Sequence, residues 1–168
     1  FQSKNLKNKF KDGIHVINED NIYIKSPNLL NPGVMIDASN GPVIVADNVK
    51  IQSFSLLQGP LYIGEDSTVQ PHTFVRGSVI GPVCKIGGEI SSSIIQGWSN
   101  KVHYGFLGNS YIGQWVNFGA GTTNSNLKNN YTPVNVTINE NVVKTDELFI
   151  GLFAGDYTTF AIGTTLNT

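Results

Sequence analysis

The sequence has little of what several large protein classes require. It contains one cysteine, Cys84, so an intrachain disulfide framework is excluded. Charged residues make up 14% of the chain and the net charge is −1, without the basic stripe of a nucleic-acid binder, so no nucleic-acid partner is expected. Neither a signal peptide nor an apolar run of membrane length is present, so we expect no membrane partner and a cytoplasmic location.

Long helix-forming runs of Ala, Glu, Leu and Lys are also missing, whereas glycine occurs 18 times. This composition favours an all-β fold rich in turns. With 168 residues and 40% hydrophobic content, the chain is long enough for one continuous core. Residues 1–20 do not share the repeat described below, and we interpret them as an N-terminal connector with a possible short amphipathic helix at residues 5–11.

From Ile24 onwards, aliphatic residues recur at intervals of six, with two steps of nine. The longest unbroken series comprises Val45, Ile51, Leu57, Ile63, Val69 and Val75. Neither the helical period of 3.6 nor the strand period of 2 fits this spacing. A six-residue unit is typical of a parallel β-helix, in which each unit forms one side of a triangular coil. Cys84 lies in a strand-like run and is expected to be a small buried side chain.

The stretch from Ser99 to Asn126 keeps the repeat but contains two exceptions. A nine-residue step leads from Ile86 to Ile95, and the next inward positions include Lys101 and Asn124. A polar side chain inside a core is costly unless it is paired or turned outward. These two residues therefore predict a locally altered coil.

Residues 127–147 leave the period, and the repeat resumes before the chain ends. The alternation of Val134, Val136 and Ile138, followed by a polar turn and Val142, predicts a hairpin that projects from the solenoid. We therefore expect a β-helix domain over residues 21–168, interrupted by an excursion at 127–147, and belonging to a longer chain.

The repeat resembles that of the hexapeptide-repeat transferases, whose fold is a left-handed parallel β-helix that assembles as a homotrimer. Within that family, residues 101–126 look like the acetyltransferase half of the bifunctional N-acetylglucosamine-1-phosphate uridyltransferase/glucosamine-1-phosphate acetyltransferase. The matching residues are His103, Leu107-Gly108, Ile112-Gly113, Val116-Asn117-Phe118-Gly119-Ala120-Gly121-Thr122 and Asn126. Bacterial sugar-nucleotidyltransferase-like proteins share the motifs SNK-x-H-x-GFLGNS and NSNLKNNY. In those proteins, a nucleotidyltransferase-like domain precedes the β-helix.

The resemblance implies a role for each matched residue. His103 would be the general base of acetyl transfer from acetyl-CoA, and Asn117 and Asn126 would contact the amino sugar. The backbone N–H of Ala120, beside Gly121, would face the thioester of acetyl-CoA. Each has a structural alternative: a histidine bonded to a neighbouring coil, asparagines of a coil turn, or glycines of a tight corner.

The remaining matched positions concern the acceptor. Arg76, the only arginine, resembles the family residue that holds the sugar phosphate, and Lys101 lies either beside the sugar site or at a solvated corner. Ser91 and Ser92 replace a family lysine pair, and Phe106 replaces the family tyrosine at the substrate. The acceptor site therefore lacks two cations and one hydroxyl, which weakens the expected hold on a phosphosugar.

The resulting hypothesis is an acetyl-CoA-dependent N-acetyltransferase that acts on an amino-sugar phosphate similar to glucosamine-1-phosphate. The alternative is a non-catalytic β-helix that trimerises or regulates a sugar-1-phosphate nucleotidyltransferase. A zinc hydratase on the same fold needs three histidines that meet at a subunit boundary, two of them closely spaced. His15, His72 and His103 are far apart, so no metal site is expected.

Overall fold

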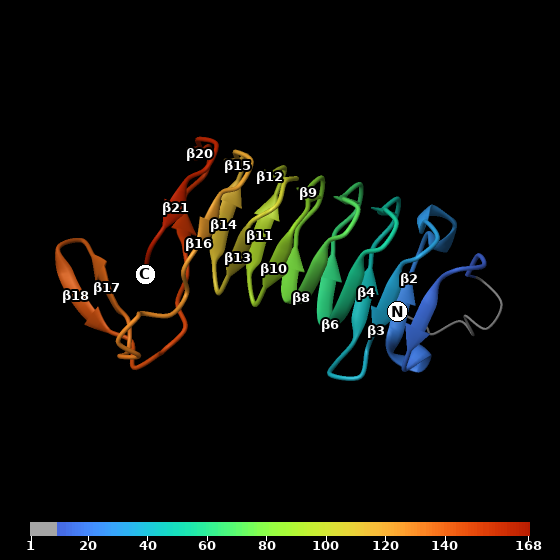
Figure 1. The fold of residues 1–168 in the computed structure, drawn as a ribbon, viewed down its shortest axis with the longest axis horizontal. Helices are drawn as coiled ribbons and strands as arrows, with labels where there is room; N and C mark the ends of the chain where they lie inside the picture. Colours follow the sequence, from blue (N-terminus) through green and yellow to red (C-terminus); the bar gives the residue numbers. More distant parts are fainter. Residues whose placement is uncertain (1–9) are drawn as a thin grey trace.

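The computed structural model describes residues 10–168, which form a left-handed parallel β-helix of about six turns (Figure 1). The predicted all-β fold of hexapeptide repeats is confirmed. Within this range the only helices are two short 3₁₀ turns, η1 (Glu19–Asn21) and η2 (Pro27–Leu29). The possible helix at residues 5–11 lies outside the described residues except at its last two positions. No helix in the described range is long and apolar enough to cross a membrane.

Three faces surround the core, and successive strands on each face pair in parallel. The first face consists of β1 (His15–Ile17), β3 (Met35–Asp37), the first parts of β6 (Leu56–Ile63) and β8 (Phe74–Ile80), β10 (Glu89–Ser91) and β13 (Phe106–Gly108). The second face consists of β2 (Ile22–Ile24), β4 (Val43–Val45), the later parts of β6 and β8, β11 (Ile94–Gly97), β14 (Tyr111–Gln114) and β19 (Phe153–Ala154). The third face consists of β5 (Lys50–Ile51), β7 (Thr68–Val69), β9 (Lys85–Ile86), β12 (Asn100–Lys101), β15 (Asn117–Phe118) and β20 (Thr159–Phe160).

The strand β1 lies within residues 1–20, the range that the sequence predicts to be a connector, and it pairs in register with β3. At the other end, β16 (Thr123–Asn124) follows β13 along the first face and pairs with β21 (Thr165–Leu166). The solenoid therefore runs from near the start of the described residues to their end.

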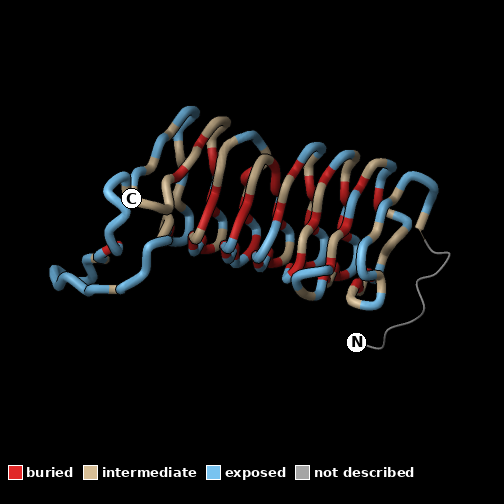
Figure 2. Tube along the Cα trace, turned by 60° about the horizontal axis from the view of Figure 1, so that its bottom comes forward, coloured by how far each residue is buried: buried red, intermediate tan, exposed pale blue. Residues whose placement is uncertain are grey.

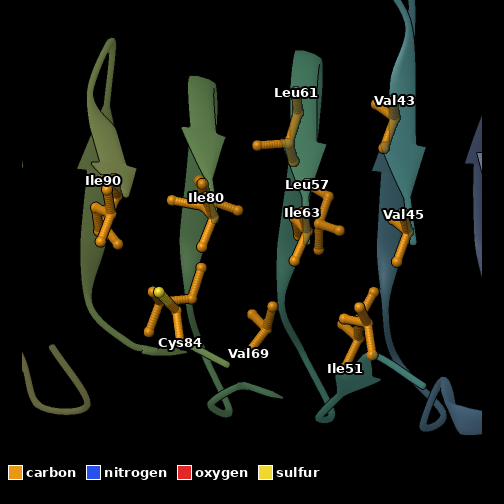
Figure 3. Close-up of a cluster of buried hydrophobic side chains, with 14 of the residues drawn as sticks. Val43, Val45, Ile51, Leu57, Leu61, Ile63, Val69, Ile80, Cys84 and Ile90 are labelled. Carbon is orange, nitrogen blue, oxygen red and sulfur yellow. The ribbon is translucent and has the colours of Figure 1, made fainter. Parts of the chain in front are cut away.

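The core is a stack of inward, mostly aliphatic side chains (Figure 3), and buried positions recur along each coil (Figure 2). Ile51, Leu57 and Ile63 follow one another at six-residue intervals and are all fully buried. Cys84 is also fully buried, as predicted, and burial raises the pKa of its thiol to about 11. Each step of six residues thus leads from the inward position on one face to the inward position on the next face.

Ile86 and Ile95 are both buried, nine residues apart as the sequence indicated, but Ile90 between them is a further inward residue that the six-residue period did not predict. Ile90 pairs with Val75 in the preceding coil and with Leu107 in the next. Residues on the first face are therefore separated by 15 positions across this coil and by 17 across the next. The sides here are four or five residues long, so a search for intervals of six passes over Ile90.

Asn124 lies inside the solenoid and completes the link between β13 and β16. Its Oδ1 accepts a hydrogen bond from the Gly108 N–H at 2.9 Å, and its Nδ2 donates to the Gly108 carbonyl at 3.1 Å. The Thr123 Oγ1 accepts from the Phe106 N–H at 3.3 Å. Side chains here take over the bonds that a backbone ladder makes elsewhere, as the expected altered coil requires.

The excursion carries the predicted hairpin, formed by β17 (Asn135–Ile138) and β18 (Asn141–Lys144). Asn139 and Glu140 connect them with φ values of 47° and 67°, which is a two-residue turn of the type that matches strand twist. The hairpin projects beyond the end of the solenoid, and most of its residues are exposed (Figures 1 and 2). The solenoid closes around the excursion, because the Asp156 carboxylate accepts a hydrogen bond from the Gln114 N–H, 42 residues earlier.

Candidate functional site

His103 lies on the corner that connects the third face to the first, between β12 and β13. Its side chain is exposed, whereas its carbonyl oxygen accepts a hydrogen bond from the Lys101 Nζ at 3.2 Å. The carbonyl and the imidazole thus have separate surroundings. A base that must meet a substrate needs this exposure.

Lys101 is not at a solvated corner, because its side chain is only 3% exposed. Its ammonium donates to the carbonyl oxygens of Gly87, His103 and Gly105 at 3.0, 3.2 and 2.8 Å. Burial lowers the pKa of this lysine to about 8. All three ammonium protons have acceptors, so the buried amine is satisfied. The sequence marked this residue as an exception but did not predict its partners.

Asn117, Ala120 and Gly121 lie one coil after His103. Asn117 is exposed on the third face, in register with Asn100. Ala120 and Gly121 form the following corner, and no protein acceptor for the Ala120 N–H lies among residues 10–168. Gly121 has φ +74°, and a Cβ there would come within 2.8 Å of the Tyr104 hydroxyl. The backbone conformation of this corner therefore favours glycine, and a larger residue would also displace the exposed Tyr104 side chain.

Arg76 lies on the first face, at the point where β8 turns from the first face to the second. Its Nε donates to the Ser91 hydroxyl at 3.1 Å, and its guanidinium lies 5.2 Å from the centre of the Phe74 ring. The side chain is exposed while Ser91 is buried. The guanidinium is thus bonded at Nε to a buried hydroxyl of the next coil, while the arginine side chain stays exposed to solvent.

Phe106 and Asn126 meet over Gly108, which is in register with Ser91. A Cβ at Gly108 would come within 2.2 Å of the Phe106 ring and within 3.0 Å of the Asn126 amide nitrogen. That nitrogen donates to the Asn109 side-chain oxygen at 2.7 Å. Arg76, Phe106 and Asn126 therefore share the first face, in three of four successive coils.

The predicted site residues fall into two groups within one chain. Arg76, Phe106 and Asn126 face outward from the first face, while Asn117 faces outward from the third. His103 lies on the corner between these faces, with Ala120 and Gly121 on the same corner of the next coil. Sequence reasoning missed Glu89, a half-buried carboxylate in register with Phe74 and Phe106, because the short coil hides its alignment. No group of three His, Cys, Asp or Glu side chains in residues 10–168 could hold a metal ion.

No family model matches the chain. It is similar to curated proteins named bifunctional protein GlmU. The protein from Picosynechococcus sp. is 33% identical over 109 residues, which cover 63% of this chain and 23% of the relative. That from Rippkaea orientalis is 35% identical over 100 residues, covering 58% and 21%. That from Bartonella bacilliformis is 27% identical over 160 residues, covering 90% and 33%.

The chain thus spans about a fifth to a third of the length of these relatives. Its fold and these similarities agree with the resemblance inferred from the repeat and from the frame around His103. The chain is a left-handed β-helix of hexapeptide repeats that is similar to part of the bifunctional protein GlmU and resembles its acetyltransferase domain.

Proposed function

We propose that this protein is an acetyl-CoA-dependent N-acetyltransferase that acts on an amino-sugar phosphate, with glucosamine-1-phosphate as the first candidate. The observation that carries the proposal is the exposed imidazole of His103, one coil before the corner formed by Ala120 and Gly121. These residues belong to the frame shared with the acetyltransferase domain, and the GlmU relatives support the same assignment. The β-helix is then the C-terminal part of a bifunctional sugar-nucleotide enzyme.

His103 acts as the general base in this proposal. It takes a proton from the acceptor ammonium, so that the nitrogen lone pair can attack the thioester carbon of acetyl-CoA. The C–N bond forms, the C–S bond breaks and coenzyme A leaves; the second proton that the nitrogen loses in becoming an amide balances the proton that the departing sulfur gains. The Ala120 N–H is the donor assigned to the carbonyl oxygen on which negative charge develops. Asn117 orients the acceptor because its amide offers both a donor and an acceptor.

Arg76 is assigned to the acceptor phosphate, with Phe106 and Asn126 beside the sugar. The Ser91 contact fixes the guanidinium at Nε and leaves its terminal nitrogens for the ligand. Arg76 is the only cation on the first face from β8 to β16, and Glu89 lies in register between Phe74 and Phe106. The electrostatic hold on a phosphate is therefore weaker than a site with a lysine pair would give.

The proposed homotrimer has a surface suited to association. The second face presents Val79, Ile94, Tyr111 and Phe153 in register, and all four are exposed. Four residues after each of them, the corner between the second and third faces presents a further exposed apolar side chain: Val83, Trp98, Trp115 and Tyr157. The two tryptophans stack with their ring centroids 6.1 Å apart. Exposed apolar patches of this kind mark interaction sites.

Association through this surface would explain why the predicted site residues lie on different faces of one chain. The second face of one copy would pack beside the third face of the next. The third face ends at the corner that carries His103. The second face begins next to the Asn109–Asn126 pair. The two groups of site residues would then meet between copies, within a closed cyclic assembly.

The test is free-thiol release from acetyl-CoA with glucosamine-1-phosphate as acceptor, with identification of the N-acetylated product by mass spectrometry. Wild type should release thiol in step with product, and His103→Ala should lose on the order of 10²- to 10⁴-fold in rate. His15→Ala is the matched control, because His15 is an exposed histidine on the first strand, far from the proposed site. It should keep the wild-type rate.

A second function, a non-catalytic β-helix that holds a sugar-1-phosphate nucleotidyltransferase in a trimer, is favoured by one observation. Ser91 and Phe106 stand where the resembled family has a cation and a hydroxyl. No thiol release from wild type with any amino-sugar phosphate, combined with intact self-association, would replace the acetyltransferase with this scaffold.

A further inference from the structure

The corner between the third and first faces is closed from inside by a hydroxyl in most coils. A Ser or Thr hydroxyl donates to the carbonyl oxygen three residues earlier, at 2.7 to 2.9 Å. The four pairs are Ser55–Gln52, Thr73–Gln70, Thr122–Gly119 and Thr164–Ala161. In each, the hydroxyl residue lies four positions after the inward residue of the third face. This bond satisfies the corner carbonyl without any ligand from outside.

Two successive coils lack that hydroxyl. Their inward residues on the third face are Ile86 and Lys101, and the fourth position after each is Ile90 or Gly105. The Lys101 ammonium lies between these two coils and bonds to both. Its contact with the Gly87 carbonyl replaces the missing hydroxyl of the first coil, and its contacts with the His103 and Gly105 carbonyls hold the second.

The neighbouring backbone leaves room for this cluster. Gly88 has φ +73°, and a Cβ there would come within 3.1 Å of the Lys101 Nζ and within 2.8 Å of the Gly105 oxygen. Any other residue at position 88 would press on the ammonium and on its acceptors. The glycine and the lysine therefore form one arrangement, which occurs at the corner that carries His103.

We propose that Lys101 is a positioning residue for His103: the Lys101 ammonium fixes the His103–Tyr104 and Gly105–Phe106 peptide planes from inside the solenoid and so orients the exposed imidazole toward its substrate. The proposal rests on the proposed acetyltransferase function, because only a reaction gives His103 a required orientation. A hydroxyl has one proton to share between two carbonyls, as at Ser55, which lies near the carbonyls of Gln52 and Gln70. An ammonium has three protons and bonds to three carbonyls in two coils. Because the Lys101 side chain is only 3% exposed, its three carbonyl acceptors replace the water that burial removes from the ammonium.

The test compares Lys101→Met with Thr73→Val. Methionine keeps the length of lysine and matches the apolar column of Ile86 and Phe118, but donates no hydrogen bond. Thr73→Val removes a hydroxyl closure from the same corner two coils before that of His103. The readouts are the imidazole NMR signals of the chain's three histidines, assigned with His15→Ala and His103→Ala, and kcat and KM for thiol release.

We expect Lys101→Met to shift or broaden the His103 signal alone and to lower kcat on the order of 10- to 100-fold, with KM for acetyl-CoA unchanged. Thr73→Val should change neither the His103 signal nor kcat. An unchanged His103 signal in folded Lys101→Met would overturn the proposal, whatever the activity. If wild type releases no thiol, the proposed function fails, and the NMR signal still decides whether Lys101 orients His103. Lys101→Ile is the second variant, and failure of both variants to fold would also overturn the proposal, since Lys101 would then serve the fold as a whole.

Discussion

The coils before residue 96 and the coils from 97 to 126 share one backbone path but differ in what fills them. In the earlier coils the inward positions hold aliphatic side chains such as Ile51, Leu57 and Ile63, all with no exposed surface (Figure 3). In the later coils the inward positions include Lys101 and Asn124, whose polar atoms bond to backbone groups of neighbouring coils. The earlier coils gain stability from apolar burial. In the later coils, Lys101 and Asn124 occupy inward positions and hold the backbone beneath the proposed site by hydrogen bonds.

The largest stability effect should come from the aliphatic coils. Ile36→Ala should lower the free energy of unfolding by about 2–5 kcal/mol, because a fully buried side chain leaves a cavity. Met35→Ala, one residue earlier and facing outward, should cost well under half as much. Urea unfolding measures both. Equal losses would mean that the inward stack does not dominate the stability of these coils.

The pH dependence of stability should distinguish the later coils. Burial lowers the pKa of Lys101 from 10.5 to about 8, so between these values the unfolded chain binds a proton that the folded protein does not. The contribution of this group is therefore fully present above pH 10.5 and is lost as the pH falls through 8. Relative to Lys101→Met, wild type should gain up to about 3 kcal/mol in free energy of unfolding as the pH rises across this window.

The buried Cys84 thiol acts with the opposite sign. Its pKa is raised from 9.0 to about 11, so stability falls between these values as the unfolded chain loses a proton that the folded protein retains. Both proteins carry Cys84, so its contribution cancels in the comparison. A difference between wild type and Lys101→Met that stays flat from pH 8 to 10.5 would contradict the burial of a charged amine.

A smaller loss should follow from Asn124→Leu. Leucine has a similar size, but it leaves the Gly108 N–H without its acceptor, which should cost about 1–3 kcal/mol, while the Gly108 carbonyl keeps its bond from the Ser110 hydroxyl. Hydrogen exchange should report this locally, with the Gly108 amide losing protection while the Ile63 amide keeps it. Retained protection at Gly108 would show that β13 and β16 stay together without the Asn124 side chain.

The smallest effect on stability should come from the hairpin. Its two strands are mostly exposed, so replacing residues 136–143 with a short glycine linker should change the free energy of unfolding by less than about 1 kcal/mol. The same variant should be assayed for thiol release. A higher KM for the acceptor would place the hairpin at the acceptor pocket, and an unchanged KM would separate it from the site.

The sequence predicted the solenoid and the hairpin well because both depend on local patterns. An inward position every six residues and a two-residue turn between alternating strands can each be recognised without long-range contacts. The short coil around Ile90 broke the period and was missed. The three acceptors of Lys101 could not be predicted, because they depend on which corners stack, and that follows from coil lengths. Likewise, the frame around His103 indicated candidate residues but not that Asn117 and Arg76 face outward from different sides of the chain.

The central claim is that the coils from 97 to 126 carry the general base on a backbone fixed by buried polar side chains, whereas apolar burial in the earlier coils supplies most of the stability. Its most direct test is to measure thiol release and urea unfolding on the same preparation of His103→Ala. The account predicts a wild-type free energy of unfolding, since the imidazole is exposed, together with a rate at least about 100-fold lower. A rate equal to that of wild type would contradict the account and remove His103 from the reaction.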